Sequence, residues 1–320
     1  MLKTVFCVFF GFFFTICPAF AQEIYVHGGL TNRTDSSDSS YAWGLTYLHG
    51  LGDYAAWSVS YMNEGHIPNH KRDGLSLQFW GRYPLFGRSV SLAAGIGPYM
   101  YFDTTRPSFD NSYSNTHGVG TVMSVSATLY TESRFLFQAR SNWTWTSQNA
   151  NTFATTIGIG YQLEGATKKD AHNESPHKTS PSGNNEVAIL AGVSAINEWA
   201  DHGTGWTGAL EYRRNLFRYL EWSTGWLVEG GPVSRKGPMT QIWASRKFFD
   251  DRFSLGVGAG PYLGFEASRG GNVTKVDWLV SASASYQIHN NWAIRATWGR
   301  VTTDYDRDTD VVLSGIAYRF

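Results

Sequence analysis

The sequence predicts an all-β protein, an antiparallel β-barrel that crosses a membrane, and three observations support this fold class. Polar and apolar residues alternate with a period of two over long stretches, as in strands with one apolar face. Aromatic residues make up 16% of the chain and charged residues only 16%, whereas roughly 25% of a soluble domain is charged. After residue 21, no segment is apolar for the about 18 residues that a membrane helix needs. A closed barrel is the other structure that satisfies its backbone in lipid.

The chain contains two similar copies of one long unit. The matching segments are Trp57-Ser58 with Trp222-Ser223, Gln78-Phe79-Trp80 with Gln241-Ile242-Trp243, Gly97-Pro98-Tyr99 with Gly260-Pro261-Tyr262, and Tyr161 with Tyr318. The offset between the copies drifts only where loops are predicted. So long a period indicates duplication of a whole structural unit rather than a solenoid. We therefore predict a first half at 22–163, a polar periplasmic linker at 164–185 and a second half at 186–320.

Residues 1–21 have the features of a secretory signal peptide. A lysine is followed by the almost wholly apolar Val5 to Ile16, and residues 18–21 provide a small-x-small cleavage site. The apolar run is shorter than the about 20 residues of a membrane helix. Cys7 and Cys17 both lie in this leader, so the mature protein would have no disulfide and no cysteine ligand.

Each copy contains eight predicted strands joined by alternately short and long connections. In the first copy these strands lie near 23–31, 41–50, 55–64, 74–84, 89–103, 117–130, 135–146 and 152–163. Short turns of the second copy are predicted near Arg213-Arg214-Asn215, Asp250-Asp251 and His289-Asn290-Asn291. Short turns at one rim and long polar loops at the other are typical of bacterial outer-membrane barrels.

The end of the chain carries a further resemblance. Tyr318-Arg319-Phe320 places an aromatic residue at the end of an amphipathic strand, which resembles the assembly signal of outer-membrane β-barrel proteins. The resemblance covers the mature chain at the level of this porin-like class and indicates no narrower family. It implies an integral protein of the outer membrane of a Gram-negative bacterium. Its partners would then be membrane lipids, lipopolysaccharide and the barrel-assembly machinery.

A secreted soluble β-sandwich is the alternative fold, because it also has alternating strands. Aromatic residues near the predicted strand ends favour the membrane barrel, since such residues form belts at the two membrane interfaces. These residues are Trp57, Tyr61, Trp143, Trp145, Trp222, Trp226, Trp292 and Trp298.

Two closures of the barrel are compatible with the sequence. The last strand of the first copy can pair with the first strand of either copy, because the two first strands are alike. We favour one ring of about sixteen strands, which would leave an aqueous lumen. Two tandem rings of eight strands are the alternative, and these would leave room only for their own side chains.

The candidate functional residues are polar and aromatic side chains that point inward by strand parity. In a wide ring, aromatic rings could stack on sugars while hydroxyl and amide groups exchange hydrogen bonds with them. Opposed charges in the lumen could bias solute passage, and structural ion pairs inside the barrel are the alternative. The predicted lumen-lining residues are Ser58, Glu64, Gln78, Trp80, Arg82, Tyr99, Arg140, Glu229, Gln241, Trp243, Tyr262 and Arg295.

The polar segment 63–73 supplies the candidate residues of an enzyme. Glu64, His66 and His70 could perform acid–base chemistry on lipopolysaccharide or phospholipid from an external loop. The second copy keeps Glu229 and has neither histidine, so a structural or pore role explains the shared residues better than an active site. Whether the protein is an enzyme stays open, with a non-enzymatic role preferred.

The sequence predicts no cofactor, no metal site and no nucleic-acid partner. The histidines and acids match no metal-binding signature, and the four aspartates between Asp304 and Asp310 lack the glycine and glutamate of a calcium loop. The chain has 26 basic and 26 acidic residues, which gives no basic footprint for nucleic acid.

Three functions are compatible with these observations. The preferred one is a channel for passage or export of a polar solute or saccharide. The second is an outer-membrane enzyme that modifies lipopolysaccharide or phospholipid. The third is a structural or adhesive barrel, which a solid lumen and unaltered lipids would favour. The sequence does not indicate the oligomeric state.

Overall fold

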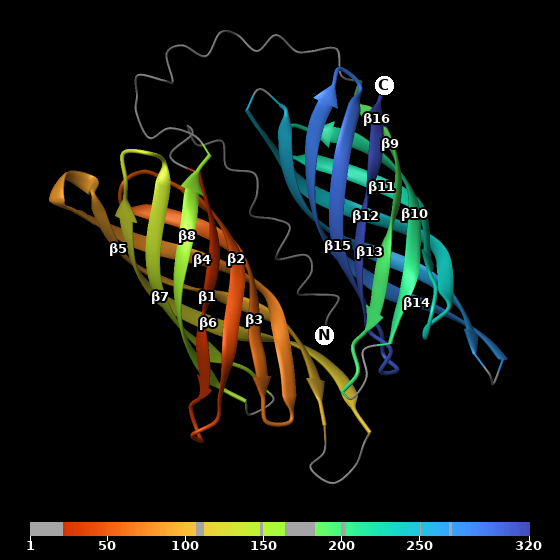
Figure 1. Ribbon diagram of the computed structural model, residues 1–320, viewed down its shortest axis with the longest axis horizontal. Coiled ribbons are helices and arrows are strands. Elements are labelled where there is room, and N and C mark those ends of the chain that lie inside the picture. The colour runs from red at the N-terminus through yellow and green to blue at the C-terminus, as the bar shows by residue number, and fades with distance from the viewer. Residues whose placement is uncertain are drawn as a thin grey trace. The chain divides into compact units, whose positions relative to one another are not determined.

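The computed structural model describes residues 22–106, 112–147, 150–163, 183–199, 203–249, 251–268 and 271–320. The predicted signal peptide and residues 164–182 of the predicted linker lie outside the described residues. The chain divides into two compact units, Met1–Glu174 and Ser175–Phe320. Each unit contains one closed barrel of antiparallel strands (Figure 1).

The first barrel has eight strands in sequential order, each paired with its neighbours along the chain. They are β1 (Gln22–Arg33), β2 (Ser39–Gly50), β3 (Ala55–Ile67), β4 (His70–Leu85), β5 (Val90–Thr105), β6 (Ser114–Tyr130), β7 (Phe135–Trp145) and β8 (Thr152–Gln162). A short 3₁₀ turn, η1 (Phe86–Arg88), joins β4 to β5.

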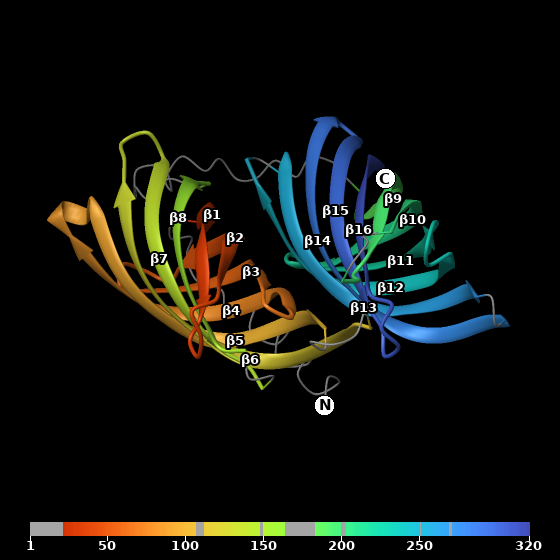
Figure 2. The same ribbon diagram turned by 60° about the horizontal axis from the view of Figure 1, so that its bottom comes forward.

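The second barrel repeats this arrangement, and the strands of both barrels curve around their own lumen (Figure 2). Its strands are β9 (Asn185–Ile196), β10 (Thr204–Phe217), β11 (Leu220–Glu229), β12 (Arg235–Phe248), β13 (Phe253–Ser268), β14 (Gly271–His289), β15 (Trp292–Thr302) and β16 (Thr309–Arg319). The predicted all-β antiparallel barrel class and the eight strands per copy are therefore confirmed.

The favoured prediction of one sixteen-stranded ring was wrong, and the alternative of two tandem barrels is confirmed. β1 pairs with β8 in unbroken register from Glu23↔Gln162 to Arg33↔Thr152. β9 pairs with β16 in the same way. The inward side chains suit a narrow ring, because the large ring of Trp80 packs directly over Gly95, its register partner on the neighbouring strand. A wide ring would not need this complementarity.

The strands extend further than predicted at one rim of the first barrel. β3 continues to Ile67, and β4 already begins at His70. The predicted loop within 63–73 is therefore reduced to the two residues Pro68 and Asn69. In the second barrel, the predicted turn at Arg213-Arg214-Asn215 lies inside β10, and the turn itself falls at Arg218 and Tyr219. We call the rim with the β2–β3, β4–β5 and β6–β7 connections the turn rim and the opposite rim the loop rim, and we use the same names for the equivalent rims of the second barrel.

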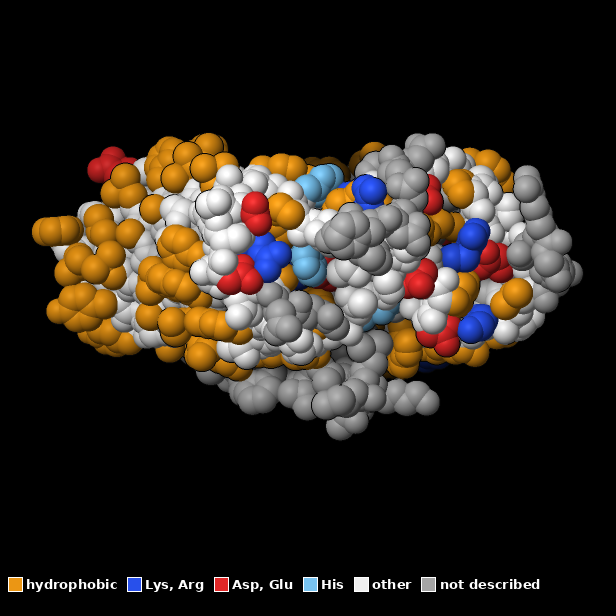
Figure 3. Space-filling model, turned by 90° about the horizontal axis from the view of Figure 1, so that it is seen from below, with side chains coloured by type: hydrophobic (Ala, Val, Ile, Leu, Met, Phe, Trp, Pro, Cys, Tyr) orange, Lys and Arg blue, Asp and Glu red, His pale blue; other side chains and the backbone are white. Residues whose placement is uncertain are grey.

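The outer wall of each barrel is apolar. Ile157 is 75% exposed, Ile189 is 71% exposed and Val26 is 59% exposed, although all three lie in the middle of regular strands. Figure 3 shows hydrophobic side chains spread over the flank of the first unit, on the left, with charged side chains gathered in small groups. Of the aromatic residues predicted to form a belt, Trp145, Trp226 and Trp292 are among the exposed ones. Among the described residues, no helix is long and apolar enough to cross a bilayer.

Cysteine cross-linking tests the closure into two rings. Val26 and Ile159 are register partners across the β1–β8 seam and both face outward. Register partners lie about 4.5–5.5 Å apart at Cα, which is within the range of a disulfide. The double substitution Val26→Cys with Ile159→Cys is expected to give an intramolecular cross-link, measured by mass spectrometry and gel mobility with and without reductant.

The control replaces the β8 partner by its equivalent in β16. Ile316 precedes Tyr318 at the same spacing as Ile159 precedes Tyr161, so it would meet Val26 in a sixteen-stranded ring. Val26→Cys with Ile316→Cys is expected to give no intramolecular cross-link. Efficient cross-linking of this second pair and not the first would show that the closure described here is incorrect.

Candidate functional site: the polar networks inside the barrels

The predicted lumen-lining residues all lie on the inner faces of the barrels. All but Arg82 are at most 4% exposed, and the Arg82 side chain is 12% exposed. They belong to two lumens rather than one, with Ser58 to Arg140 in the first barrel and Glu229 to Arg295 in the second. Their side chains contact one another across each lumen, so they fill it.

One buried tryptophan lies among the inward side chains of each barrel. Trp80 Nε1 donates to Ser58 Oγ at 2.8 Å, and Trp243 Nε1 donates to Ser223 Oγ at 2.9 Å. The ring in each barrel lies over a glycine. A Cβ atom at Gly95 would stand 2.5 Å from the Trp80 ring, and one at Gly258 would stand 2.3 Å from the Trp243 ring. Because glycine has no side chain, Gly95 and Gly258 leave the space that the two indole rings occupy.

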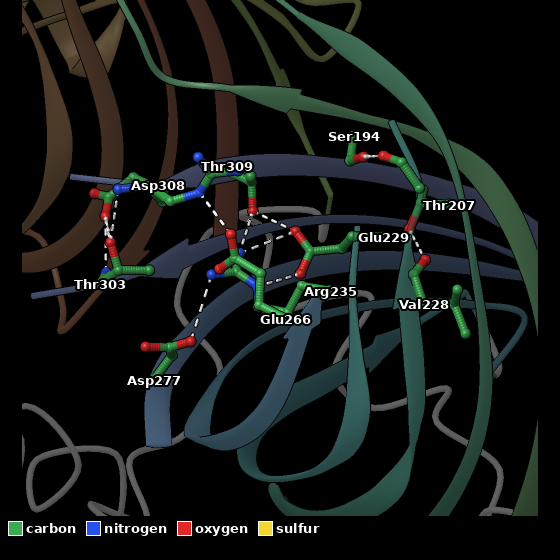
Figure 4. Close-up of polar contacts among 12 residues, drawn as sticks. Ser194, Thr207, Val228, Glu229, Arg235, Glu266, Asp277, Thr303, Asp308 and Thr309 are labelled. Atoms are coloured by element: carbon green, nitrogen blue, oxygen red, sulfur yellow. Dashed lines mark hydrogen bonds and ion pairs between the residues drawn. The ribbon is translucent and has the colours of Figure 1, made fainter. Parts of the chain in front are cut away.

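Nearer the loop rim of the second barrel, a glutamate and an arginine form a bidentate pair (Figure 4). Arg235 Nε and Nη2 donate to the two carboxylate oxygens of Glu229 at 2.8 and 3.1 Å. The hydroxyl of Thr309 donates to the same carboxylate and accepts from Arg235 Nη2 at 2.9 Å. Asp277 lies 3.4 Å from Arg235 Nη1. Both members of the pair are at most 1% exposed, so they are desolvated and satisfied by one another.

The first barrel contains the same clamp at equivalent positions. Arg72 Nε donates to Glu64, and its Nη2 donates to Thr152 Oγ1 at 3.1 Å. Thr152 donates in turn to Glu64, and the hydroxyl of Tyr99 donates to Glu64 at 3.3 Å. Here the guanidinium also donates to the carbonyl of Ala150 at 2.5 Å. We call the two groups, Glu64-Arg72-Thr152 and Glu229-Arg235-Thr309, the rim clamps.

Sequence reasoning found the glutamates of the rim clamps and missed their arginines and threonines. Arg72 lies in the segment that the sequence predicts as an external loop, although it precedes Tyr99 at the same spacing as Arg235 precedes Tyr262. In the last strands, Thr152 precedes Tyr161 at the same spacing as Thr309 precedes Tyr318. The matching spacings were therefore the signal that these residues are equivalent.

The middle and the turn rim of the second barrel contain a denser charge network. Arg295 Nη1 donates to Glu211 at 2.7 Å, and Arg319 Nε donates to Glu186 at 2.7 Å. Arg213 donates to Glu211 at 3.1 Å from Nε and to Glu221 at 3.3 Å from Nη1. The Arg213 guanidinium also stacks 3.9 Å from the centre of the Trp243 ring, which adds a cation–π contact.

The first barrel has a sparser arrangement. Near the turn rim, Arg82 lies 3.4 Å from Glu23, and the hydroxyl of Tyr130 donates to Glu23 at 3.0 Å. In the middle, Arg140 donates to Gln78 at 2.5 Å and to Asn142 at 2.7 Å and lies over the Trp80 ring. The acceptors around Arg140 are amides and hydroxyls rather than carboxylates.

The three residues of the predicted enzymatic site do not converge. Glu64 points into the lumen, where Arg72 holds it. A bulge at Gly65, which has a φ of +67°, breaks the alternation, so His66 turns to the outer side of the wall and lies 5.7 Å from the Tyr41 ring. His70 pairs with Asp103 at 2.7 Å at the loop rim. Among the described residues, no group of three metal-ligating side chains is present.

The aspartates between Asp304 and Asp310 have partners within the protein. Asp308 accepts from the backbone and hydroxyl of Thr303, and Asp310 pairs with Arg300 at 2.6 Å. Asp304 lies 2.8 Å from Lys275 Nζ at the loop rim, and this hydrogen bond lowers the pKa of the exposed carboxyl group.

Removing the glutamate of a rim clamp is expected to destabilise the first barrel more than the second. In the Glu64→Gln variant, Arg72 keeps only neutral hydrogen-bond acceptors, and a buried charge without its partner costs about 3 kcal/mol. In Glu229→Gln, Arg235 still has Asp277 at 3.4 Å, so the loss is smaller. Urea unfolding of the refolded protein measures both. Asp35→Asn at an exposed pair is the control and should change the free energy of unfolding by less than about 1 kcal/mol. Equal losses for the two glutamine variants would contradict this account.

Filling the space beside an indole is expected to destabilise the barrel. In Gly95→Ala the new Cβ overlaps the Trp80 ring, and overpacking of this kind costs about 1–3 kcal/mol. Gly81→Ala is the matched control, because a Cβ there has nothing within 4 Å. Urea unfolding should show a lower midpoint for Gly95→Ala and an unchanged midpoint for Gly81→Ala. A Gly95→Ala protein as stable as the control would mean that the indole does not occupy this position.

No protein-family model and no curated protein matches this chain. The chain is similar to solved outer-membrane β-barrels. The N-terminal barrel domain of Pseudomonas aeruginosa OprF is 14% identical with a TM-score of 0.37, over 44% of this chain and 96% of that one. Neisserial surface protein A is 11% identical with a TM-score of 0.34, over 44% and 95%. The KdgM porin, solved with a disordered oligogalacturonate, is 8% identical with a TM-score of 0.21, over 93% and 99%. These structures belong to the class that the sequence resembles.

Proposed function

We propose that the protein is an integral outer-membrane protein of a Gram-negative bacterium whose two filled barrels act as structural anchors for the connections at their loop rims. The observation that carries the proposal is the pair of buried rim clamps. Each clamp contains an ion pair that is almost wholly excluded from solvent, and this pair lies inside the lumen of a barrel of only eight strands. A structural role of this kind, which includes adhesion through the loops, requires no passage through the barrel.

The polarity of the barrels supports the membrane location. Charged Arg235 and Glu229 are at most 1% exposed, while apolar Ile157 and Ile189 are 75% and 71% exposed. A water-soluble protein has the opposite distribution. The strands have from 10 residues in β11 to 19 in β14, and a tilted membrane strand needs about 9–11. Lipid and lipopolysaccharide would then surround the walls, and the barrel-assembly machinery would insert them, after removal of residues 1–21.

The channel hypothesis depended on a wide ring. Gln78, Trp80 and Tyr99 do point inward as that hypothesis requires, but they pack against Ser124, Ser58 and Glu64. A saccharide could pass only if these contacts and the rim clamp opened together. An eight-stranded barrel has an interior that its own side chains fill, so the geometry favours the anchor over transport.

The enzyme hypothesis has less support from the geometry. A lipid-modifying site needs an acid or base that reaches the substrate. Glu64 is satisfied by Arg72, Thr152 and Tyr99 inside the lumen, and His66 lies on the other side of the wall. Mass spectrometry of lipid A from cells with and without the gene is expected to show no difference.

Conductance in planar bilayers tests the anchor proposal. The purified, refolded protein is expected to give no stable open steps in concentrated potassium chloride, because the ion pairs and indoles block each lumen. A sixteen-stranded porin in the same bilayer serves as the positive control. Long-lived steps of uniform size that persist after repurification would overturn the proposal and restore the channel hypothesis.

A further inference from the structure

Arg140 is the feature of the first barrel that the anchor role does not explain. Its guanidinium is 4% exposed in the middle of the lumen. Its acceptors are Gln78, Asn142, Thr46 and Ser124, at distances of 2.5 to 3.4 Å. All four are neutral. Among the described residues, no salt bridge joins Arg140 to a carboxylate, so no counter-charge contacts this buried cation. Burial of such a charge is costly unless an anion pairs with it.

The second barrel shows what the first one lacks. Leu45-Thr46-Tyr47 in β2 corresponds to Leu210-Glu211-Tyr212 in β10, because the two segments precede Trp57 and Trp222 at the same spacing. Thr46 therefore stands where the second copy has Glu211, the carboxylate that accepts from Arg295 and Arg213. The strand pairing agrees, because Leu45 pairs with Val26 and Leu210 pairs with Ile189. The first barrel has thus a cation in the middle of its lumen and a hydroxyl where the second copy supplies the acid.

A cavity borders Arg140 on this side. It has a volume of about 20 Å³, and its lining includes Arg140, His27, Thr46, Asn142 and Thr156. A single buried water needs about 10–15 Å³, so this space holds one water or one monatomic ion and is too small for a phosphate or sulfate. Glu64 also lines the cavity, and its carboxylate is already paired with Arg72.

His27 provides an independent sign that the cavity takes a ligand. The side chain is 5% exposed, and neither ring nitrogen has a hydrogen-bond partner within the described protein. The equivalent residue of the second copy is Leu190, because His27 follows Val26 in β1 as Leu190 follows Ile189 in β9. An unsatisfied imidazole at this depth is costly. The N–H of its ring would donate to an anion in the cavity, as the guanidinium of Arg140 would.

We propose that this cavity binds one monatomic anion, with chloride as the ligand, between Arg140 and His27. The anion supplies a negative charge beside Thr46, the residue that stands at the position of Glu211 in the first barrel. It neutralises Arg140 without widening the lumen, and the site belongs to the first barrel alone. Binding of an anion at this site depends on the electrostatics of the lumen and not on the anchor role of the barrel.

Unfolding in matched salts tests this proposal on the full-length refolded protein. Chloride is compared with gluconate, which is too large for the cavity, at equal ionic strength. The wild-type melting temperature is expected to be about 3 °C higher in chloride, because an anion that binds only the folded state stabilises it. A wild-type protein with the same melting temperature in both salts would overturn the proposal.

The matched variant supplies the missing carboxylate. Asn142 Oδ1 accepts from Arg140 Nε at 2.7 Å, so Asn142→Asp replaces this amide oxygen by a charged one of nearly the same shape. This variant is expected to melt at the same temperature in both salts. An undiminished chloride effect in Asn142→Asp would show that the effect arises elsewhere. If that variant does not fold, Arg140→Gln takes its place with the same expected result.

Crystals soaked in bromide locate the anion directly. An anomalous peak between Arg140 and His27 is expected in the wild type, and its absence is expected in Asn142→Asp. Water without any anomalous signal in the wild-type cavity would overturn the proposal, whatever the melting temperatures show.

Discussion

The narrowness of an eight-stranded ring is the constraint on which both barrels depend. Such a ring has no room for a column of water, so inward polar side chains have to find most of their partners among other inward side chains. The rim clamps meet this condition because a bidentate arginine, a threonine hydroxyl and a carboxylate complete one another. The tryptophans meet it because each indole donates to a serine and lies over a glycine. Outside, the same constraint is absent, and the walls are simply apolar.

Strand parity predicts the inner face well, because side chains alternate with a period of two and the outer face of the wall is apolar while the inner face carries the buried polar residues. The number of rings could not be predicted in this way. β8 and β16 carry equivalent residues such as Ile159 and Ile316, so β1 would find an acceptable partner in either ring. The decision depends on how well the inner side chains fill a narrow lumen, which is a property of three-dimensional packing.

Two local errors have a common physical origin. The sequence predicts a turn at Arg213-Arg214-Asn215 and a loop at Arg72, because charged residues normally mark exposed segments. Both arginines lie in strands and point into a lumen, where carboxylates hold them. The bulge at Gly65 has a separate effect, because it turns His66 to the opposite side of the wall from Glu64, although the two residues have the same parity. In these barrels, a charged residue can therefore mark the inner face of a strand as well as a loop.

Comparison of the two barrels distinguishes the inward contacts that both contain from those that differ between them. The rim clamp, the tryptophan and its glycine are present in both, at matching positions and with matching contacts. The middle of the lumen differs, because Glu211, Glu221 and Arg295 in the second barrel replace the largely neutral surroundings of Arg140 in the first. Both arrangements leave the wall and its register unchanged. The scaffold therefore accepts different charge patterns in its centre, and in the first barrel, where no carboxylate contacts Arg140, the proposed anion would balance that buried charge.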